Sequence, residues 1–466
     1  MMIPTDVFQA RRAQLFAKML PGSVALIASG SEQIRNRDVE QGFRADSDFW
    51  YLTGFTEPDS VLVLIRSPVL ENLSQYQAAE AQTQPSRRIT NKPVDNQAWL
   101  FLRAKDPEKE TWQGRRLGVD AAPALLAVDL AFDIDELDAQ LLDLLGHAQT
   151  VYFSFEQMAD WGLRLADWLA ELKSKARKGI QSPSQLFDLD EVLHEQRLIK
   201  SAIEIEWMRQ AAQISVQGHL AAMRAAQVGG YEYQIHAAVE QAFRYHGSPR
   251  IAFNTIVAAG DNACILHYTE NNAPLKDGDL VLVDAGAEWK GYAGDISHTF
   301  PINGRFTSPQ AQLYNLVLAA QQAAIAQIKP GNRYDQMHQA STRVLTEGLL
   351  ALGLLRGELE SLLEKQAVKK YFMHGTGHWL GMDVHDVGRY KINGEWRVFE
   401  PGMVVTVEPG LYILPDDTDV EPQWRGIGIR IEDDVWVTEH GCDLLTQGLP
   451  RTPEEIAQWM QQTQMS

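Results

Sequence analysis

The sequence predicts an α/β (α+β) protein in which an N-terminal mixed-sheet α/β domain precedes a pseudo-symmetric second domain. Three observations support this prediction. Apolar runs typical of strands alternate with amphipathic segments typical of helices. A helix–helix–strand–strand order occurs twice in the second part of the chain. The length of 466 residues also exceeds the size at which one hydrophobic core usually keeps growing.

Composition narrows the class of protein. The 45% of hydrophobic and 22% of charged residues are typical of a soluble globular protein. The net charge of -19 argues against nucleic acid as a partner, because phosphate binding needs a basic surface. The sequence contains no run of eighteen apolar residues that would predict a membrane span. The N-terminus also lacks the basic start and following apolar run that are typical of a signal peptide. With only Cys264 and Cys442, a cytoplasmic location is expected.

The N-terminal part begins with an amphipathic pattern from Asp6 to Leu20, which predicts a helix that Pro21 and Gly22 stop. Further patterns predict strands at 23–28, 61–65, 99–102 and 151–153, and helices at 134–145 and 158–172. Residues 67–97 are rich in Gln, Asn, Ser and Pro, and we interpret them as a flexible insertion. The aromatic stretch from Phe49 to Phe55 is better explained by a buried core or domain interface than by substrate contact.

The pattern changes near Ser182-Pro183-Ser184, and we assign residues 1–190 to the first domain and 191–466 to the second. A capping box of Ser201 and Glu204 opens a long helix that Gly229-Gly230 ends. The remaining patterns predict helices at 232–246, 309–328 and 334–352, and strands at 252–258, 280–285, 292–300, 403–408 and 427–432.

Two aspartates on neighbouring predicted strands, Asp284 and Asp295, stand eleven residues apart. Alone they could be turn residues, but Glu408 and Glu432 also fall at the ends of predicted strands. Glu432 continues an alternating pattern with Gly426, Gly428 and Arg430, so that all four share one face. A solvated face would explain Arg430 and Glu432, whereas glycine at the two preceding positions indicates something packed closely against the strand.

Three histidines, His374, His378 and His385, lie among glycines that allow close approach of the backbone to ligands. Their spacing does not match the His-Glu-x-x-His pattern of a zinc-binding helix, and we expect one to bind metal and others to contact substrate. Four carboxylates and one imidazole form an oxygen-rich set that suits two divalent ions such as manganese, cobalt or magnesium. Bridging cations would keep these carboxylates ionised and lower the pKa of a shared water.

The motifs that carry this chemistry resemble those of the pita-bread metallopeptidases, which include methionine aminopeptidase, prolidase, creatinase and aminopeptidase P. The N-terminal stretch 49–55 is similar to the N-terminal domain of the aminopeptidase P and prolidase branch. Segments 265–271, 291–295 and 425–434 are most similar to bacterial aminopeptidase P. The matching motifs are Val283-Asp284-Ala285-Gly286, Gly294-Asp295-Ile296, His374-Gly-Thr-Gly-His378, Val407-Glu408-Pro409-Gly410 and Arg430-Ile431-Glu432-Asp433.

The resemblance implies a pita-bread catalytic domain that releases the N-terminal residue from peptides with proline second. It implies that Asp284 binds one ion, that His378 and Glu408 bind the other, and that Asp295 and Glu432 bridge the two, with manganese the usual activator. It further implies that Glu408 accepts the proton of the water that becomes the attacking hydroxide, and that His267 and His374 stabilise the tetrahedral intermediate. The substrate-binding residues that it implies are His385, Tyr412 and Arg430, the last two as supporting residues. A homo-oligomer, dimer or tetramer, is expected.

Proline in the second position has a physical consequence for the enzyme. An Xaa-Pro bond has no N–H to donate and a fixed φ, so peptidases that read an extended backbone handle it badly and a dedicated pocket is needed. Prolidase, which shares every ligand but accepts dipeptides only, is the alternative activity. A binding protein that uses the cleft without catalysis is a second alternative, against which the complete ligand set argues.

Overall fold

The computed structural model describes residues 4–67 and 96–464, which form two compact units, 1–196 and 197–466. The division falls within α8 (Asp190–Leu198), at whose first residue the sequence places the domain boundary. Most of the proposed insertion at 67–97 lies outside the described residues, except that Gln97 already belongs to a strand. No helix among the described residues is both long and apolar enough to cross a membrane.

The first unit is built around a six-stranded mixed sheet in the order β6-β5-β4-β1-β7-β8. The pairs β1–β4 and β4–β5 are antiparallel, whereas β1–β7, β7–β8 and β5–β6 are parallel, which confirms the predicted mixed sheet. Its elements are α1 Thr5–Lys18, β1 Ser23–Ala28, β2 Ile34–Asn36, β3 Val39–Glu40, α2 Ser47–Thr53, β4 Val61–Ile65, β5 Gln97–Leu102, α4 Pro107–Gln113, α5 Ala122–Leu126, β6 Leu130–Asp133, α6 Leu137–Leu145, β7 Thr150–Phe153, α7 Met158–Ser174 and β8 Gln185–Asp188.

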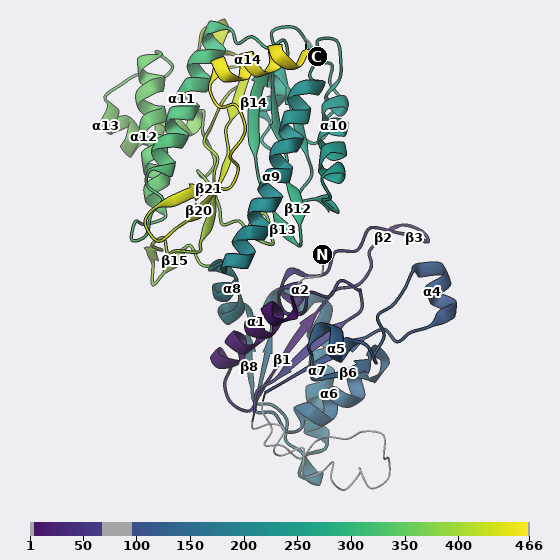
Figure 1. Cartoon of the computed structure of the whole chain (residues 1–466). Coiled ribbons are helices and arrows are strands. Elements are labelled where there is room, and N and C mark those ends of the chain that lie inside the picture. Colours follow the sequence, from purple (N-terminus) through teal and green to yellow (C-terminus); the bar gives the residue numbers. More distant parts are fainter. Residues whose placement is uncertain (1–3, 68–95, 465–466) are drawn as a thin grey trace. The chain divides into compact units, whose positions relative to one another are not determined.

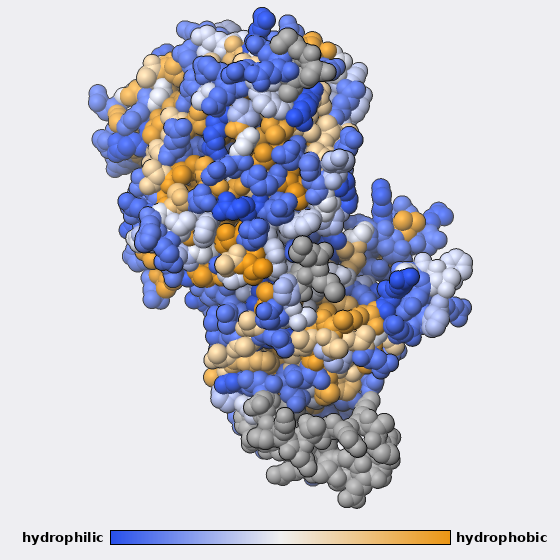
Figure 2. Space-filling view, viewed as in Figure 1, coloured by the Kyte–Doolittle hydropathy of each residue, from blue (hydrophilic) through white to orange (hydrophobic). Residues whose placement is uncertain are grey.

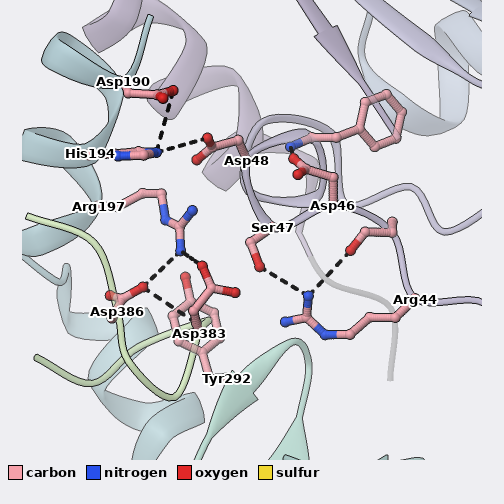
Figure 3. A network of polar contacts seen from close by, with 12 residues as sticks. Arg44, Asp46, Ser47, Asp48, Asp190, His194, Arg197, Tyr292, Asp383 and Asp386 are labelled. Carbon is pink, nitrogen blue, oxygen red and sulfur yellow. Dashed lines mark hydrogen bonds and ion pairs between the residues drawn. The ribbon is translucent and has the colours of Figure 1, made fainter. Parts of the chain in front are cut away.

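Buried side chains explain the order of the first unit. The central strands β1 and β4 are buried along their whole length, because α6 and α7 pack against the sheet with Leu141, Leu145 and Trp168. The aromatic stretch at α2 is buried, as the core interpretation requires. On the same unit His194 lies between Asp48 and Asp190, 3.1 and 3.6 Å from their carboxylate oxygens (Figure 3).

The second unit contains two similar halves. In each, two helices are followed by a three-stranded antiparallel sheet, β10-β11-β14 in the first half and β17-β20-β21 in the second. Figure 1 shows α9 and α10 on one side of these strands and α11 and α12 on the other. The elements are α9 Ala202–Ala225, α10 Glu232–Tyr245, β9 Arg250–Ile251, β10 Ile256–Ala259, β11 Leu280–Asp284, β12 Ala287–Trp289, β13 Tyr292–Ala293, β14 Ser297–Pro301, α11 Ser308–Ile325, α12 Asp335–Ala351, α13 Leu359–Glu364, β15 Lys391–Ile392, β16 Glu395–Trp396, β17 Val404–Val407, β18 Gly410–Ile413, β19 Ile427–Arg430, β20 Asp433–Val437, β21 Cys442–Leu444 and α14 Pro453–Gln464.

Local signals in the sequence account for these elements. The capping box at α9 is present, with Ser201 N–H donating to Glu204 at 2.9 Å. The two helix pairs and their strands bury a shared apolar core that includes Phe243, Val283, Tyr314 and Leu345. On the face drawn in Figure 2, hydrophilic residues cover most of the surface, which fits an acidic chain with its apolar residues inside. The twofold helix–helix–sheet order expected from the sequence is therefore observed.

Candidate metal centre and active site

One cavity of about 790 Å³ in the second unit brings the predicted site residues together. All five predicted metal ligands line it, as do the three other histidines and Arg430. These residues are Asp284, Asp295, His378, Glu408, Glu432, His267, His374, His385 and Arg430. Tyr412 is buried beside the cavity, where its hydroxyl contacts His374. Residues 130 positions or more apart in sequence thus meet at one place.

The first half of the unit supplies the two aspartates. Asp284 is the last residue of β11 and pairs with Ser297 at the start of β14. The sequence predicted one continuous strand from 292 to 300, but this prediction is wrong. The strand is interrupted between β13 and β14, and Asp295 lies in the loop that connects them. There the backbone N–H of Asp295 donates to the carboxylate of Asp434 at 3.2 Å, which fixes the loop and aims the side chain inward.

The second half supplies the two glutamates. Glu408 directly follows β17, and Glu432 stands between β19 and β20. Antiparallel pairing of β17 with β20 sets Val407 opposite Asp433, so the two glutamates emerge side by side. The close packing inferred from glycine is confirmed at Gly428, where an added Cβ would stand 2.3 Å from the Ala263 carbonyl oxygen.

Gly426 differs from that expectation. It precedes β19 rather than belonging to it, and its φ of +73° is a conformation that residues with a Cβ rarely adopt. The alternating strand is therefore shorter than predicted. Arg430 on its inward face is 4% exposed, which excludes the solvated-face interpretation.

His378 presents one ring nitrogen to the carboxylates. Its Nδ1–H donates to the Trp379 carbonyl at 3.0 Å, so Nε2 is left to face Asp295 Oδ2 at 3.5 Å and Glu408 Oε1 at 3.8 Å. A hydrogen bond of this kind fixes the tautomer and orientation of metal-binding histidines. Ligand atoms of Asp295, His378 and Glu432 all lie within 4.8 Å of one another, a spacing that can hold one metal ion.

Arg430 and His378 compensate the four carboxylates only in part. Burial raises the pKa of Glu408 to about 7, and burial together with the charge of Asp295 raises the pKa of Glu432 well above its usual value. Burial also raises the pKa of Asp295. For His378, burial would lower the pKa, but the hydrogen bond and charge of Asp295 raise it to about 9. Without bound cations, these carboxylates would tend to take up protons. Cations bound at the site would keep the carboxylates ionised.

Asp284 gives a second sign of fit. Its Oδ2 accepts a hydrogen bond from Arg430 at 2.7 Å, whereas its buried Oδ1 has no hydrogen-bond partner among the described residues. Buried carboxylate oxygens are normally satisfied. The donor set of oxygen atoms with one imidazole therefore fits one or two hard divalent ions, with Asp284 providing an oxygen that nothing else in the described chain uses.

A chain of hydrogen bonds runs from Asp284 to His374. Arg430, which also donates through Nε to Ser297 Oγ at 2.7 Å, donates to the Tyr412 hydroxyl at 3.0 Å, and that hydroxyl lies 2.8 Å from His374 Nε2. His374 Nδ1–H donates to the Gly375 carbonyl at 2.7 Å. Burial and the charge of Arg430 lower the pKa of His374 to about 3, so this imidazole is neutral.

The other two histidines are more accessible. His385 and His267 are both exposed on the cavity wall. The His385 ring stands edge-on to His378 with centroids 4.4 Å apart, and burial together with His378 lowers the pKa of His385. Both rings can therefore reach a molecule that enters the cavity.

The segment from His374 to His385 is held by Asp386, the residue that follows it. This carboxylate is buried and accepts hydrogen bonds from Arg197 and Lys200, each at 2.8 Å (Figure 3 shows Arg197). Burial would raise the pKa of Asp386, but the charges of Lys200 and Arg197 hold it below its usual value. The backbone N–H of Asp386 also donates to the Trp379 carbonyl, so the turn that presents His378 and His385 is closed at both ends.

Sequence reasoning missed several residues that support the ligands. Asp434 binds the backbone of Asp295, and Arg451 donates to both oxygens of Asp433. Gln321 of α11, which is fully buried, donates to the carbonyls of Val407 and Ile431, one residue before each glutamate. Asp433 and Asp434 adjoin a motif and could have been suspected, whereas a glutamine within an amphipathic helix carries no such signal.

Comparison with known proteins agrees with this geometry. The model of metallopeptidase family M24 matches residues 206–439, and the model of the aminopeptidase P N-terminal domain matches residues 8–152. The Xaa-Pro aminopeptidase of Escherichia coli K12 is 43% identical over 454 residues, 97% of each chain. The solved aminopeptidase PepP of Pseudomonas aeruginosa is 46% identical with a TM-score of 0.92, and the match covers 100% of this chain and 99% of that one.

A third relative has been solved with a ligand. The structure of E. coli aminopeptidase P with the inhibitor Pro-Leu is 41% identical with a TM-score of 0.92 and full coverage of both chains. These matches extend over both units of the present chain, and the family models cover the residues that line the cavity. The chain therefore belongs to metallopeptidase family M24, and within that family to the pita-bread enzymes of the aminopeptidase P type.

Proposed function

We propose that this protein is an Xaa-Pro aminopeptidase, a hydrolase that releases the first residue of peptides whose second residue is proline. The observation that carries the proposal is the cavity, where every carboxylate and histidine expected for this activity lines one wall. Its relatives in the same family are Xaa-Pro aminopeptidases over nearly the full chain length. The activity is metal-dependent, as expected of a metallopeptidase.

The residues divide between two metal positions. Asp284 would hold one divalent ion, His378 and Glu408 the other, and Asp295 and Glu432 would bridge them, with Mn²⁺ the proposed metal. When bound, the ions lower the pKa of a water molecule and polarise the scissile carbonyl group. The raised pKa values of Asp295, Glu408 and Glu432 support this division, because each reports a carboxylate that needs a nearby cation to stay ionised.

The chain's own groups move the protons. Glu408, whose side chain remains partly exposed to the cavity, accepts the proton of the attacking water and later passes it to the proline nitrogen. His267 offers a ring N–H to the oxygen that becomes negative in the transition state. His374 does the same with the Nδ1–H that it now donates to the Gly375 carbonyl, which requires substrate to replace that carbonyl.

Recognition of proline follows from the lining of the cavity. The cavity is also lined by the apolar groups Phe253, Ile256, Leu266, Val384 and Tyr390, which suit an apolar ring with no N–H. His385 contacts the substrate carbonyl on the proline side. Arg430 and Tyr412 complete the substrate-binding set by holding Asp284 and His374 in place, and Arg430 also lines the cavity.

A substrate panel with added Mn²⁺ tests the proposal. The protein should cleave the first bond of Arg-Pro-Pro-type peptides and should not cleave the same peptides with alanine second. Cleavage of Gly-Pro alone would instead establish the prolidase alternative. Activity must disappear on chelation and return with Mn²⁺, and activity that survives metal removal would contradict the dinuclear site as well as the alternative of a catalytically silent binding protein.

Three broader assignments accompany the function. The boundary between an N-terminal domain, 1–190, and a catalytic domain, 191–466, is supported by family models that end and begin on either side of it. A homo-oligomer, dimer or tetramer, is testable by light scattering. A cytoplasmic location, with peptides and not nucleic acid or membrane as partners, is testable by cell fractionation.

A further inference from the structure

The segment 260–273 carries His267 but has little regular structure to hold it. Apart from one 3-10 turn, Gly260–Cys264, it is irregular, and it brings Leu266, His267 and Thr269 to the cavity. Its buried residue Tyr268 packs with Ile256 and Tyr412 in a small apolar cluster. An irregular segment needs other contacts to keep a catalytic side chain in place.

Asn271 is held by Thr255 and Val257, and four further hydrogen bonds converge on one carboxylate, Glu232, the first residue of α10. Its Oε1 accepts hydrogen bonds from Ala259 N–H at 2.7 Å and from the Asn262 side-chain amide at 3.0 Å. Its Oε2 accepts from the Tyr268 hydroxyl and from Ala273 N–H, each at 2.8 Å. One donor, Ala259, ends β10 directly before the segment, and the other three belong to the start, the middle and the end of the segment.

The environment of Glu232 is unusual for a glutamate. Its side chain is 0% exposed, and it forms no ion pair among the described residues. Burying an isolated carboxylate is costly unless several hydrogen bonds compensate it. Here four donors and the N-terminus of α10 provide that compensation, so both oxygens are satisfied. Three of the four donors belong to this segment and the fourth directly precedes it, which indicates that the function of Glu232 is to hold the segment.

We propose that Glu232 is a positioning residue of the active site, which fixes segment 260–273 and thereby holds His267 at the cavity. The link is short, because Tyr268, whose hydroxyl donates to Glu232, is the neighbour of His267 in the chain. The inference rests on the proposed role of His267 in hydrolysis. Glutamine at position 232 would keep the shape but offer one acceptor oxygen, leaving two of the four donors facing an NH₂ group.

A double-mutant cycle tests this inference. In the Mn²⁺-loaded protein, Glu232→Gln should lower kcat by about 10- to 100-fold with little change in KM, because misplacing His267 affects the transition state. In the His267→Ala background the same substitution should change kcat by less than about twofold. An equal fall of kcat in both backgrounds, or no fall in either, would overturn the inference.

Hydrogen exchange gives a readout that needs no activity. Amides of 260–273 should lose protection in Glu232→Gln and keep it in Val239→Ala, which removes volume on the same helix from a different apolar cluster than the one that contains Tyr268. Unchanged protection of the segment in Glu232→Gln would overturn the inference. If that variant does not fold, Tyr268→Phe removes one of the four bonds and should loosen the segment to a lesser degree.

Failure of this inference and failure of the proposed function are separable. Wild-type protein that cleaves no Xaa-Pro peptide would contradict the proposed function, while the exchange result would still decide whether Glu232 holds the segment. If the wild-type protein cleaves such peptides but the effects of Glu232→Gln and His267→Ala on kcat are additive, only the positioning role is contradicted.

Discussion

The two halves of the catalytic unit hold their carboxylates with different chemistry. In the first half, fully buried His219 of α9 donates its Nε2–H to the carbonyl of Ala285, next to Asp284, at 3.0 Å. In the second half, fully buried Gln321 of α11 donates to two carbonyls at 3.2 Å and to Asp433 at 3.0 Å. The same place in each half thus has a titratable imidazole in one case and a neutral amide in the other.

This difference indicates that two halves with similar folds can respond differently to mutation and to pH. Loss of a proposed bridging carboxylate from either half should be equally damaging, because both halves would hold the same ions. A fall in pH should affect the helix and strands behind the two aspartates more than those behind the two glutamates, since a second buried imidazole, His298, whose Nε2–H donates to the Pro450 carbonyl at 3.1 Å, lies beside His219. The following predictions address these two expectations.

The largest effect is expected from Asp295→Ala in the first half and Glu432→Ala in the second. Each removes a proposed bridging ligand, so kcat/KM should fall by more than about 1,000-fold. Steady-state kinetics with added Mn²⁺ and calorimetric titration of the metal measure the loss. Asp416→Ala, at an exposed position, is the matched control. Full turnover by either variant would contradict the assignment, and a large difference between the two would contradict the equivalence of the halves.

As pH falls, α9, β11 and β14 should lose stability before α11, β17 and β20. Burial lowers the pKa of His219 to about 4, and burial with the charge of His219 lowers the pKa of His298 to about 3. The unfolded chain takes up protons at these positions near pH 6.5, whereas the folded chain does not. Stability from these groups is therefore complete above about pH 6.5 and is lost as pH falls towards 4, by about 2 kcal/mol per histidine at pH 5.

Hydrogen exchange between pH 7 and pH 5, corrected for intrinsic rates, resolves this by segment. Amides of α9, β11 and β14 should lose more protection than those of α11, β17 and β20. His219→Gln retains an N–H donor without titration and should flatten the dependence of unfolding free energy on pH. Because the site carboxylates are the same in both proteins, their titration cancels in the comparison. An unchanged pH dependence in the variant would refute the role of His219.

The second half can be tested through Gln321. Gln321→Met keeps the length of the side chain but removes the amide donor from the carbonyls of Val407 and Ile431, while Asp433 keeps its bonds from Arg451; the free energy of unfolding should fall by about 1–2 kcal/mol. Mn²⁺ should also bind more weakly, because the strands that end in Glu408 and Glu432 lose their common support. Denaturant unfolding and calorimetric titration measure the two effects, with exposed Gln322→Met on the same helix as control. Unchanged metal affinity would limit Gln321 to a role in stability.

The sequence indicated the ligands better than their supports, for a physical reason. Asp284, Glu408 and Glu432 stand at the ends of apolar strands, where a charged residue is conspicuous, and the strands themselves were predicted within a few residues. The break that leaves Asp295 outside a strand depends on the pairing of Ser297 with Asp284 and on the hydrogen bond from Asp295 N–H to Asp434, which lies 139 positions further along the chain. No periodicity records such contacts.

Glu232 and Gln321 illustrate the same limit more strongly. Each occupies a helix in which polar residues are common, so the pattern alone indicates a solvated position. Both are fully buried because segments far along the chain fold over them, 260–273 in one case and the ends of β17 and β19 in the other. A polar side chain acquires such a role only when the donors or acceptors around it are known.

The smallest expected effect concerns the link between the halves. Arg430 reaches Asp284 in the first half and, through the Tyr412 hydroxyl, His374 in the second. Tyr412→Phe removes this hydroxyl and leaves His374 Nε2 without a donor, while the direct bond from Arg430 to Asp284 remains. Because a single neutral hydrogen bond contributes about 0.5–1.5 kcal/mol, kcat should fall only about three- to fivefold, with KM nearly unchanged.

A matched control separates this link from the general loss of a buried hydroxyl. Tyr371→Phe removes a buried hydroxyl that contacts the Leu354 carbonyl at 3.4 Å, away from Arg430 and His374, and should leave kcat unchanged. If Tyr412→Phe lowers kcat only in a protein that retains His374, the hydroxyl acts through that imidazole. If it lowers kcat equally in a His374→Ala background, the halves communicate through the metal ligands alone and Arg430 serves only Asp284.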